Sequence, residues 1–163
     1  MTVVEGVATI DDVDETLARL TGIAEEHDVT IQAFDARYVV SRQHLERAVE
    51  LADRAFARGE NVARDRGVEI LLYAAGRRQI DDALAMGVNE GAVPVAVVVD
   101  GAGDEAGAAA AIEDWLDPEP TLGDIDAERV RAFFDVTDPE LDVVDGSLAD
   151  LVLERVALLD VKK

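Results

Sequence analysis

The chain contains no cysteine and only two histidines among its 163 residues. The missing thiols exclude a disulfide framework, a zinc site with thiolate ligands and a cysteine nucleophile, and they fit a reducing compartment. No apolar run approaches the roughly 18 residues of a membrane-spanning helix, and the N-terminus lacks the pattern of a signal peptide. We therefore expect a soluble, cytoplasmic protein with no metal, no cofactor and no membrane partner.

The only two lysines are the last two residues of the sequence, and the other thirteen basic residues are arginines. Aromatic residues make up only 4% of the chain. Acidic residues number 36 against 15 basic ones, so the net charge is -21, and Asp outnumbers Glu by 21 to 15. Because 49% of the residues are apolar, this charge indicates a folded protein with an acidic surface rather than a disordered chain. Such a surface is typical of salt-adapted proteins. In strong salt the repulsion between the acidic groups is screened, because the Debye length falls to about 3 Å at 1 M salt.

Hydrophobic periodicity and capping residues predict alternating short strands and helices. The expected strands are residues 2–8, 30–34, 37–40 and 93–99. The expected helices are one that is capped by Asp11 or Asp12 and runs to about residue 27, then 41–59, 60–75, 77–86, 107–116, 126–134, 138–143 and one that begins at Ser147. No composition shift marks a boundary, so residues 1–163 should form one domain. The fold class is mixed α/β, with about seven or eight helices flanking a small central β-sheet of mixed strand direction.

Catalytic groups are difficult to assign in this chain, because a site based on histidine or zinc has few possible members. His44 follows the expected helix cap Ser41 and is interpreted as a surface or capping residue. With 36 acids present, any carboxylate pair chosen from the sequence would be arbitrary. We therefore expect no catalytic residue and no enzymatic activity.

The segment Gly101–Gly107 offers an alternative, because it matches the G-x-G-x-x-A spacing of a dinucleotide-binding loop between a strand and a helix. Asp104 and Glu105 argue against it, since they place two negative charges where a pyrophosphate would approach. A plain strand-to-helix turn explains the same residues. A small-molecule enzyme or nucleotide-binding protein that uses this loop remains the second hypothesis.

Positive charge is concentrated between Arg37 and Arg78, where nine arginines face six acids, while the rest of the chain carries about -24. Arg77 and Arg78 fall in the expected first turn of a helix, where the macrodipole disfavours cations. A phosphate bound after Gly76 would compensate, and so would ion pairs with Asp81, Asp82 or acids elsewhere in the fold. Tyr73 is either a core residue or a platform on which a base stacks.

Four segments carry a resemblance to a known family: AFDARYVVSRQHLERAV, GVEILLYAAGRRQIDDALAMGV, PVAVVV and LADLVLERVALLDV. In order and spacing they resemble the PRPK-binding protein (TPRKB-like) family, the small non-catalytic subunit of the KEOPS tRNA-modification complex. The most specific part of the match runs from Glu69 to Ile80. Together with the acidic composition, the resemblance indicates a halophilic archaeal member of that family.

The resemblance implies a role in making threonylcarbamoyladenosine in tRNA, by docking on the small atypical kinase of the complex and holding the single-stranded CCA 3′ end of tRNA. On this basis the expected RNA-binding residues are Arg64, Arg66, Tyr73, Gly76, Arg77, Arg78, Gln79 and Ile80. Arginines would contact phosphates, while Tyr73, Gln79 and Ile80 would meet bases. A protein-interaction module without an RNA role is the third hypothesis.

The C-terminal helix carries an apolar stripe that extends well around its circumference, through Leu153, Ala157 and Leu158. A helix of this kind is either deeply buried or shared with a partner. The resemblance favours a partner, and the expected kinase-binding residues are Leu148, Leu151, Val152, Arg155 and Leu159.

Overall fold

The computed structural model describes residues 1–137, 139 and 148–162, and its centre is a four-stranded sheet. The strands are β1 (Thr2–Ile10), β2 (Thr30–Asp35), β3 (Gly91–Asp100) and β4 (Asp117–Pro118), in the order β2-β3-β1-β4. The mixed α/β class is confirmed. Each pairing between these strands is antiparallel, where a sheet of mixed strand direction was expected.

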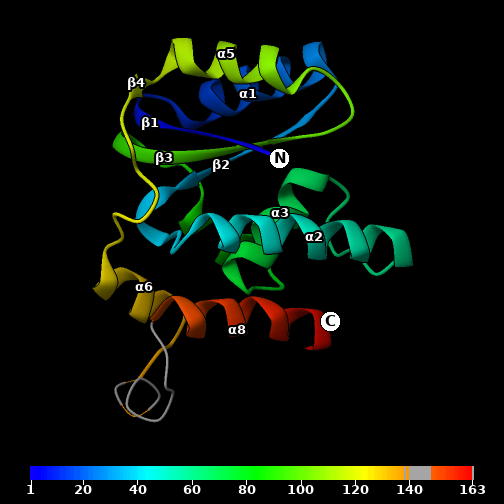
Figure 1. Cartoon of the computed structure of the whole chain (residues 1–163), viewed down its shortest axis with the longest axis vertical. Helices are drawn as coiled ribbons and strands as arrows, with labels where there is room; N and C mark the ends of the chain where they lie inside the picture. The colour runs from blue at the N-terminus through cyan, green and yellow to red at the C-terminus, as the bar shows by residue number, and fades with distance from the viewer. Residues whose placement is uncertain (138, 140–147, 163) are drawn as a thin grey trace.

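Helices cover both faces of the sheet (Figure 1). Helices α1 (Val13–His27) and α5 (Glu105–Trp115) lie on one face, α2 (Arg42–Arg58) and α3 (Arg66–Ala75) lie on the other, and α8 (Leu148–Lys162) forms a further layer beyond them. Shorter helices connect these layers: η1 (Ala36–Tyr38), α4 (Ile80–Ala83), η2 (Leu84–Met86) and α6 (Ala127–Phe133). The expected helix at 138–143, apart from residue 139, and the expected start at Ser147 lie outside the described residues.

Strand β3 lies between two hydrophobic cores, which explains its unbroken run of apolar residues. Val93, Val95, Val97 and Val99 face the core under α1 and α5, whereas Ala96 and Val98 face the core under α2, α3 and α8. A strand that is buried on both faces reads as a continuous hydrophobic segment instead of an alternating one. The prediction of a buried strand at 93–99 is therefore confirmed.

The capping residues place the helix ends as the sequence indicated. The Asp12 carboxylate accepts the Glu15 N–H at 3.2 Å, and the Ser41 hydroxyl accepts the His44 N–H at 3.2 Å. Gly59 adopts φ 68° and ends α2, as a left-handed glycine commonly does.

Two local predictions are wrong because side chains bond to the nearby backbone. Residues 37–40 are not a strand: the Asp35 carboxylate accepts the Arg37 N–H and guanidinium, and this closes the 3₁₀ turn η1. The segment 60–75 is helical only from Arg66, since Asp65 caps α3 and the Glu69 carboxylate accepts the N–H groups of Val62 and Ala63 at 3.1 Å.

His44 is fully buried, so its interpretation as a surface residue is wrong, whereas its ring does accept a backbone N–H just before α2 and so caps the helix. Its Nε2 lies 2.7 Å from Ala74 O, and its Nδ1 accepts the Val40 N–H at 3.3 Å. This pattern fixes a neutral ring with the proton on Nε2. Burial lowers the pKa of His44 to about 4, although the hydrogen bond to Ala74 acts in the opposite direction.

Two features are absent from the residues that the structure describes, 1–137, 139 and 148–162. No helix in that part of the chain is long and apolar enough to cross a membrane. The same residues contain no group of three or more His, Cys, Asp or Glu side chains that could hold a metal ion.

Candidate functional site

The turn after α3 contains the arginine pair. Gly76 has φ 63° and ends α3, with the Gly76 N–H bonded to Tyr73 O at 3.1 Å and the Arg77 N–H bonded to Leu72 O at 3.0 Å. These two bonds form a Schellman-type C-cap. The next helix, α4, begins only at Ile80, so the expected helix at 77–86 is wrong at its start.

This placement reverses the electrostatic argument made for Arg77 and Arg78. Both residues follow the C-terminus of α3, where the macrodipole stabilises cations, instead of occupying a helix N-terminus, where it disfavours them. No phosphate is therefore required to offset an unfavourable position. An RNA role for this turn depends on its exposed side chains alone.

The Arg77 side chain makes its contacts within the protein. Its guanidinium donates to Phe133 O and lies over the Phe133 ring, 4.9 Å from the ring centroid. Arg155 of α8 donates to the next carbonyls, Phe134 O at 3.2 Å and Asp135 O at 3.3 Å. Two cations thus cover the C-terminal carbonyls of α6, which is where they stabilise a helix most.

Arg78, Gln79 and Ile80 form the exposed part of the turn. Across the residues that the structure describes, Arg78 makes no hydrogen bond or ion pair, and Ile80 is 43% exposed. A cation, an amide and an apolar side chain therefore follow one another on the surface. This set can contact a phosphate, a base edge and a base face.

Arg64 lies just before α3 and Arg66 is its first residue, so both are at the end of the helix opposite the Gly76 turn, about 15 Å away by the helical rise of ten residues. Arg64 is exposed, whereas Arg66 forms a two-pronged ion pair with Asp53 and also bonds to Asp100. The hydrogen bond with Asp53 raises the pKa of Arg66. Burial lowers this pKa, and the hydrogen bond with Asp100 raises it further. These two arginines therefore do not share one spot with Arg78.

Tyr73 is fully buried in the core between α2, α3 and α8. In this position its ring cannot stack on a base, so the sequence-based assignment of Tyr73 to base contact is wrong for this structure. Glu69, one helical turn earlier, is also fully buried.

The kinase-binding residues expected on α8 face inward for the most part. Leu151, Val152 and Leu159 are 1%, 0% and 3% exposed and belong to the core, so they cannot form a docking surface without unfolding. Leu148 and Arg155 are half-buried. This part of the site prediction needs correction: the interior stripe of α8 holds the helix in place.

The outward side of α8 is the part that a partner can reach. Leu153 and Ala157 are half-buried, Leu158 is 36% exposed, and Glu154 lies between them. In Figure 1, α8 lies on the far side of α2 and α3 from the sheet. A Cβ on Gly76 would lie 3.4 Å from Arg155 O, so the turn and the middle of α8 are neighbours.

The family model described as "Kinase binding protein CGI-121" matches residues 5–160. The chain belongs to this family. The match confirms the PRPK-binding family that the sequence motifs indicated, and it spans both the Gly76 turn and most of α8. A search of the curated proteins finds none that matches the chain.

The strand-to-helix loop Gly101–Gly107 forms a tightly packed turn in the structure. A Cβ on Gly103 would lie 2.1 Å from His27 O, so this glycine allows close packing of the turn against α1. Asp104 accepts the Gly107 N–H at 2.9 Å, and Glu105 accepts the Gly101 N–H at 3.3 Å. The N–H groups that would cradle a phosphate are already bonded to the loop's own carboxylates.

Sequence reasoning missed the outward side of α8 as the accessible surface. The signal was present, because Leu153, Ala157 and Leu158 fall outside the stripe through Leu151, Val152, Val156 and Leu159. A helix that is apolar on more than one side needs a second partner once its main stripe is buried.

Proposed function

We propose that this protein is a non-catalytic accessory subunit of the KEOPS complex, which binds the complex's small atypical kinase and supports threonylcarbamoyladenosine formation in tRNA. The observation that carries the proposal is the match to the kinase-binding family, which spans residues 5–160. In the strand-to-helix loop, the Gly101 and Gly107 N–H groups are bonded to the loop's own carboxylates, and the described residues contain no group of three or more His, Cys, Asp or Glu side chains that could hold a metal ion.

The kinase-binding surface that we propose is the outward side of α8. Leu153, Ala157 and Leu158 place an apolar strip over about one and a half turns, and the acidic Asp150 and Glu154 border it. When a partner covers such a strip, each Å² of apolar surface removed from water contributes about 25 cal/mol of favourable free energy, and this burial is the usual driving force of association. Arg155 reaches inward to the end of α6 and keeps the helix in register beneath the partner.

Binding to the purified small kinase encoded in the same genome tests this surface. Leu158→Asp should weaken the complex by at least tenfold, because it places a charge at the most exposed residue of the apolar strip. Leu17→Asp is the matched control, since Leu17 is 44% exposed on α1, on the opposite side of the sheet. Equal affinities for the two variants would exclude this side of α8.

The RNA contact that we propose is the exposed run Arg78, Gln79 and Ile80, with Gly76 shaping the turn. Single-strand recognition combines phosphate contacts with base-edge hydrogen bonds and flat apolar contacts, and these three side chains provide one of each. In strong salt the apolar and hydrogen-bonding contacts matter more, because counterion release contributes less. The CCA 3′ end of tRNA is the single-stranded ligand that the family resemblance implies.

Fluorescence anisotropy in 1 M KCl, with tRNA that carries or lacks its CCA end, tests the RNA contact. We expect the intact tRNA to bind more tightly and Arg78→Glu to abolish the difference. Arg19→Glu is the control, because it makes the same charge change at an exposed position of α1. Equal binding of both RNAs, or none, leaves a kinase-binding module without an RNA role, which is the alternative function.

A further inference from the structure

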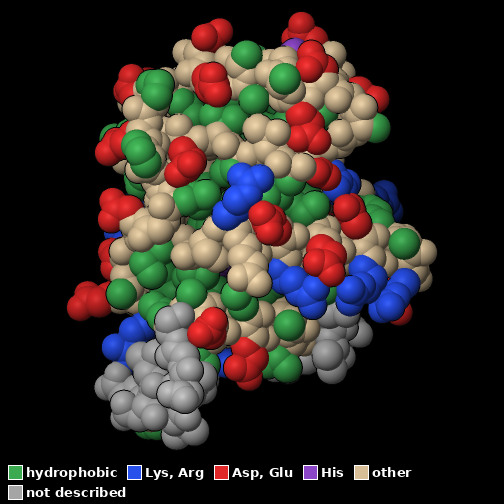
Figure 2. Space-filling model, viewed as in Figure 1, with side chains coloured by type: hydrophobic (Ala, Val, Ile, Leu, Met, Phe, Trp, Pro, Cys, Tyr) green, Lys and Arg blue, Asp and Glu red, His purple; other side chains and the backbone are tan. Residues whose placement is uncertain are grey.

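Helix α2 carries a row of arginines on the surface of a chain whose net charge is -21. Arg47, Arg54 and Arg58 are seven and four residues apart, so they lie within about 40° of one another around the helix and span about 16 Å of its length. Figure 2 shows basic side chains in a row along α2, on the side of the helix that is next to α8. We call these three residues the arginine row.

The arginine row is only partly neutralised by the helix that carries it. The Glu50 carboxylate is shared, since it lies 2.7 Å from Arg47 Nη1 and 3.4 Å from Arg54 Nη2. Arg58 is exposed and makes no hydrogen bond or ion pair with any other residue that the structure describes. Two guanidinium groups of the row therefore divide one carboxylate of their own helix, and the third has none among the described residues.

Other arginines of the chain have carboxylates of their own. Arg66 bonds to both Asp53 and Asp100, and Arg42 pairs with Glu46 at 3.0 Å. With 36 acids and 15 bases in the sequence, a carboxylate is available to most arginines. The weak pairing of the arginine row is therefore a property of this surface of α2, and the composition of the chain does not account for it.

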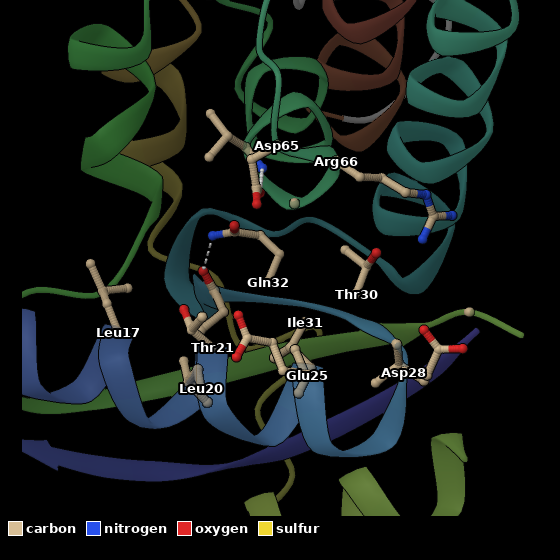
Figure 3. Close-up of a pocket in the computed structure, with 16 residues that line it drawn as sticks. Leu17, Leu20, Thr21, Glu25, Asp28, Thr30, Ile31, Gln32, Asp65 and Arg66 are labelled. Carbon is tan, nitrogen blue, oxygen red and sulfur yellow. Dashed lines mark hydrogen bonds between the residues drawn. The ribbon is translucent and has the colours of Figure 1, made fainter. Parts of the chain in front are cut away.

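The groove between α1 and the start of α3 has the opposite charge (Figure 3). Its volume is about 580 Å³, and Arg66 is the one cation among the described residues that line it, beside the acids Glu25, Asp28 and Asp65. An acidic partner is therefore repelled at this groove and attracted to the arginine row.

The partner that suits the row is a protein surface rich in carboxylates. A guanidinium binds a carboxylate through parallel N–H···O bonds of about 2.7–2.9 Å. Such contacts are shorter than the Debye length of about 3 Å at 1 M salt, so they persist where attraction over longer distances is screened. Because the row lies next to α8, which contacts α2 and carries the proposed kinase-binding surface, the kinase is the partner that reaches it.

We infer that the kinase docks across both helices and that carboxylates on its surface pair with the arginine row. This inference rests on the proposed kinase binding and adds the chemistry of the partner. Arg58 offers a whole guanidinium, while Arg47 and Arg54 bind kinase carboxylates in addition to the shared Glu50. The apolar strip of α8 supplies affinity, and the charges on α2 fix the orientation of the kinase and speed its association.

Titration calorimetry of the full chain with the purified small kinase from the same genome, in 1 M KCl, tests the row. Arg58→Glu should weaken the complex by at least fivefold, because it reverses a charge that faces the kinase. Arg19→Glu is the matched control and should stay within twofold, since Arg19 is exposed on α1 and forms no ion pair in the described part of the chain. Carbodiimide labelling should find kinase carboxylates that the wild-type protein protects and the Arg58→Glu variant leaves reactive.

A second variant should strengthen the complex, which damage to the fold would not do. Glu50→Gln removes the carboxylate that competes with the kinase for Arg47 and Arg54, so the affinity should rise by about threefold. Glu46→Gln is its control, because it makes the same charge change on the same helix, and Glu46 pairs with Arg42, outside the row. The control should leave the affinity within about 1.5-fold of the wild type.

The outcomes separate this inference from the proposed function. A wild-type complex that neither Arg58→Glu nor Glu50→Gln alters would overturn the inference and leave kinase binding in place. Failure of the wild-type protein to bind the kinase would overturn both. The same variants are titrated with tRNA, where we expect no change; if Arg58→Glu weakens tRNA binding and spares the kinase, the row contacts nucleic acid and the inference is wrong.

Discussion

Arg77 and Arg155 lie far apart in the chain, yet both donate to successive carbonyls at the C-terminus of α6, Phe133 O and Phe134 O. This relationship joins the turn after α3 to the middle of α8 and secures α6 between them. It also divides the adjacent arginine pair, since Arg77 is part of the structure and Arg78 is exposed to solvent. Substitutions at the two positions should therefore have different consequences.

Arg77→Met should lower the free energy of unfolding by about 2 kcal/mol, because it removes a charged hydrogen bond and leaves a helix C-terminus without its cation. Arg78→Met should change the free energy by less than about 0.5 kcal/mol, as expected for an exposed side chain. Urea unfolding in 2 M KCl measures both. Equal losses at the two positions would contradict the division of roles.

His44 should make stability dependent on pH above the range where the carboxylates titrate. Its pKa is about 4 in the folded protein and about 6.5 when unfolded, so the unfolded chain binds more protons between these values. The stability that neutral His44 contributes to the fold is fully present above pH 6.5, and about 2 kcal/mol of it is lost as the pH falls from 6.5 to 5.

The matched variant is His44→Gln, which does not titrate in this range and can still donate to Ala74 O. The difference in unfolding free energy between the wild type and this variant should shrink or change sign as the pH falls from 7 to 5. A difference that stays constant across this range would show that the buried histidine is not the source of the pH dependence.

Glu69 holds the loop before α3 by accepting the N–H groups of Val62 and Ala63. Glu69→Gln removes the charge and one of the accepting oxygens, so it should cost about 1–3 kcal/mol and loosen the loop. Amide exchange at Val62 and Ala63 should become faster. Exchange within β3 should change only as far as the free energy of global unfolding changes. Unchanged exchange at these two amides would contradict the role given to Glu69.

The secondary structure that the sequence predicted well is the part determined by local signals. Asp12, Ser41 and Gly59 mark helix ends through bonds and backbone angles that involve only near neighbours. The run from Val93 to Val99 indicated a strand buried on both faces, and the structure confirms it.

The predictions that failed depended on contacts distant in the sequence or on competing local bonds. His44 was misplaced because its partner, Ala74 O, lies thirty residues away. Arg77 was expected in a helix because the sequence alone does not show the Schellman bonds at Gly76. These bonds end α3, and α4 begins only at Ile80. The inward stripe of α8 was assigned to a partner because periodicity alone does not show which apolar side the fold itself covers.

The central claim is that α8 presents its outward side to a kinase, and isothermal titration of the small atypical kinase from the same genome tests it most directly. The account predicts a one-to-one complex that Leu158→Asp weakens by at least tenfold and Leu17→Asp leaves unchanged. The absence of a complex with the wild-type protein, or equal affinities for the two variants, would contradict it.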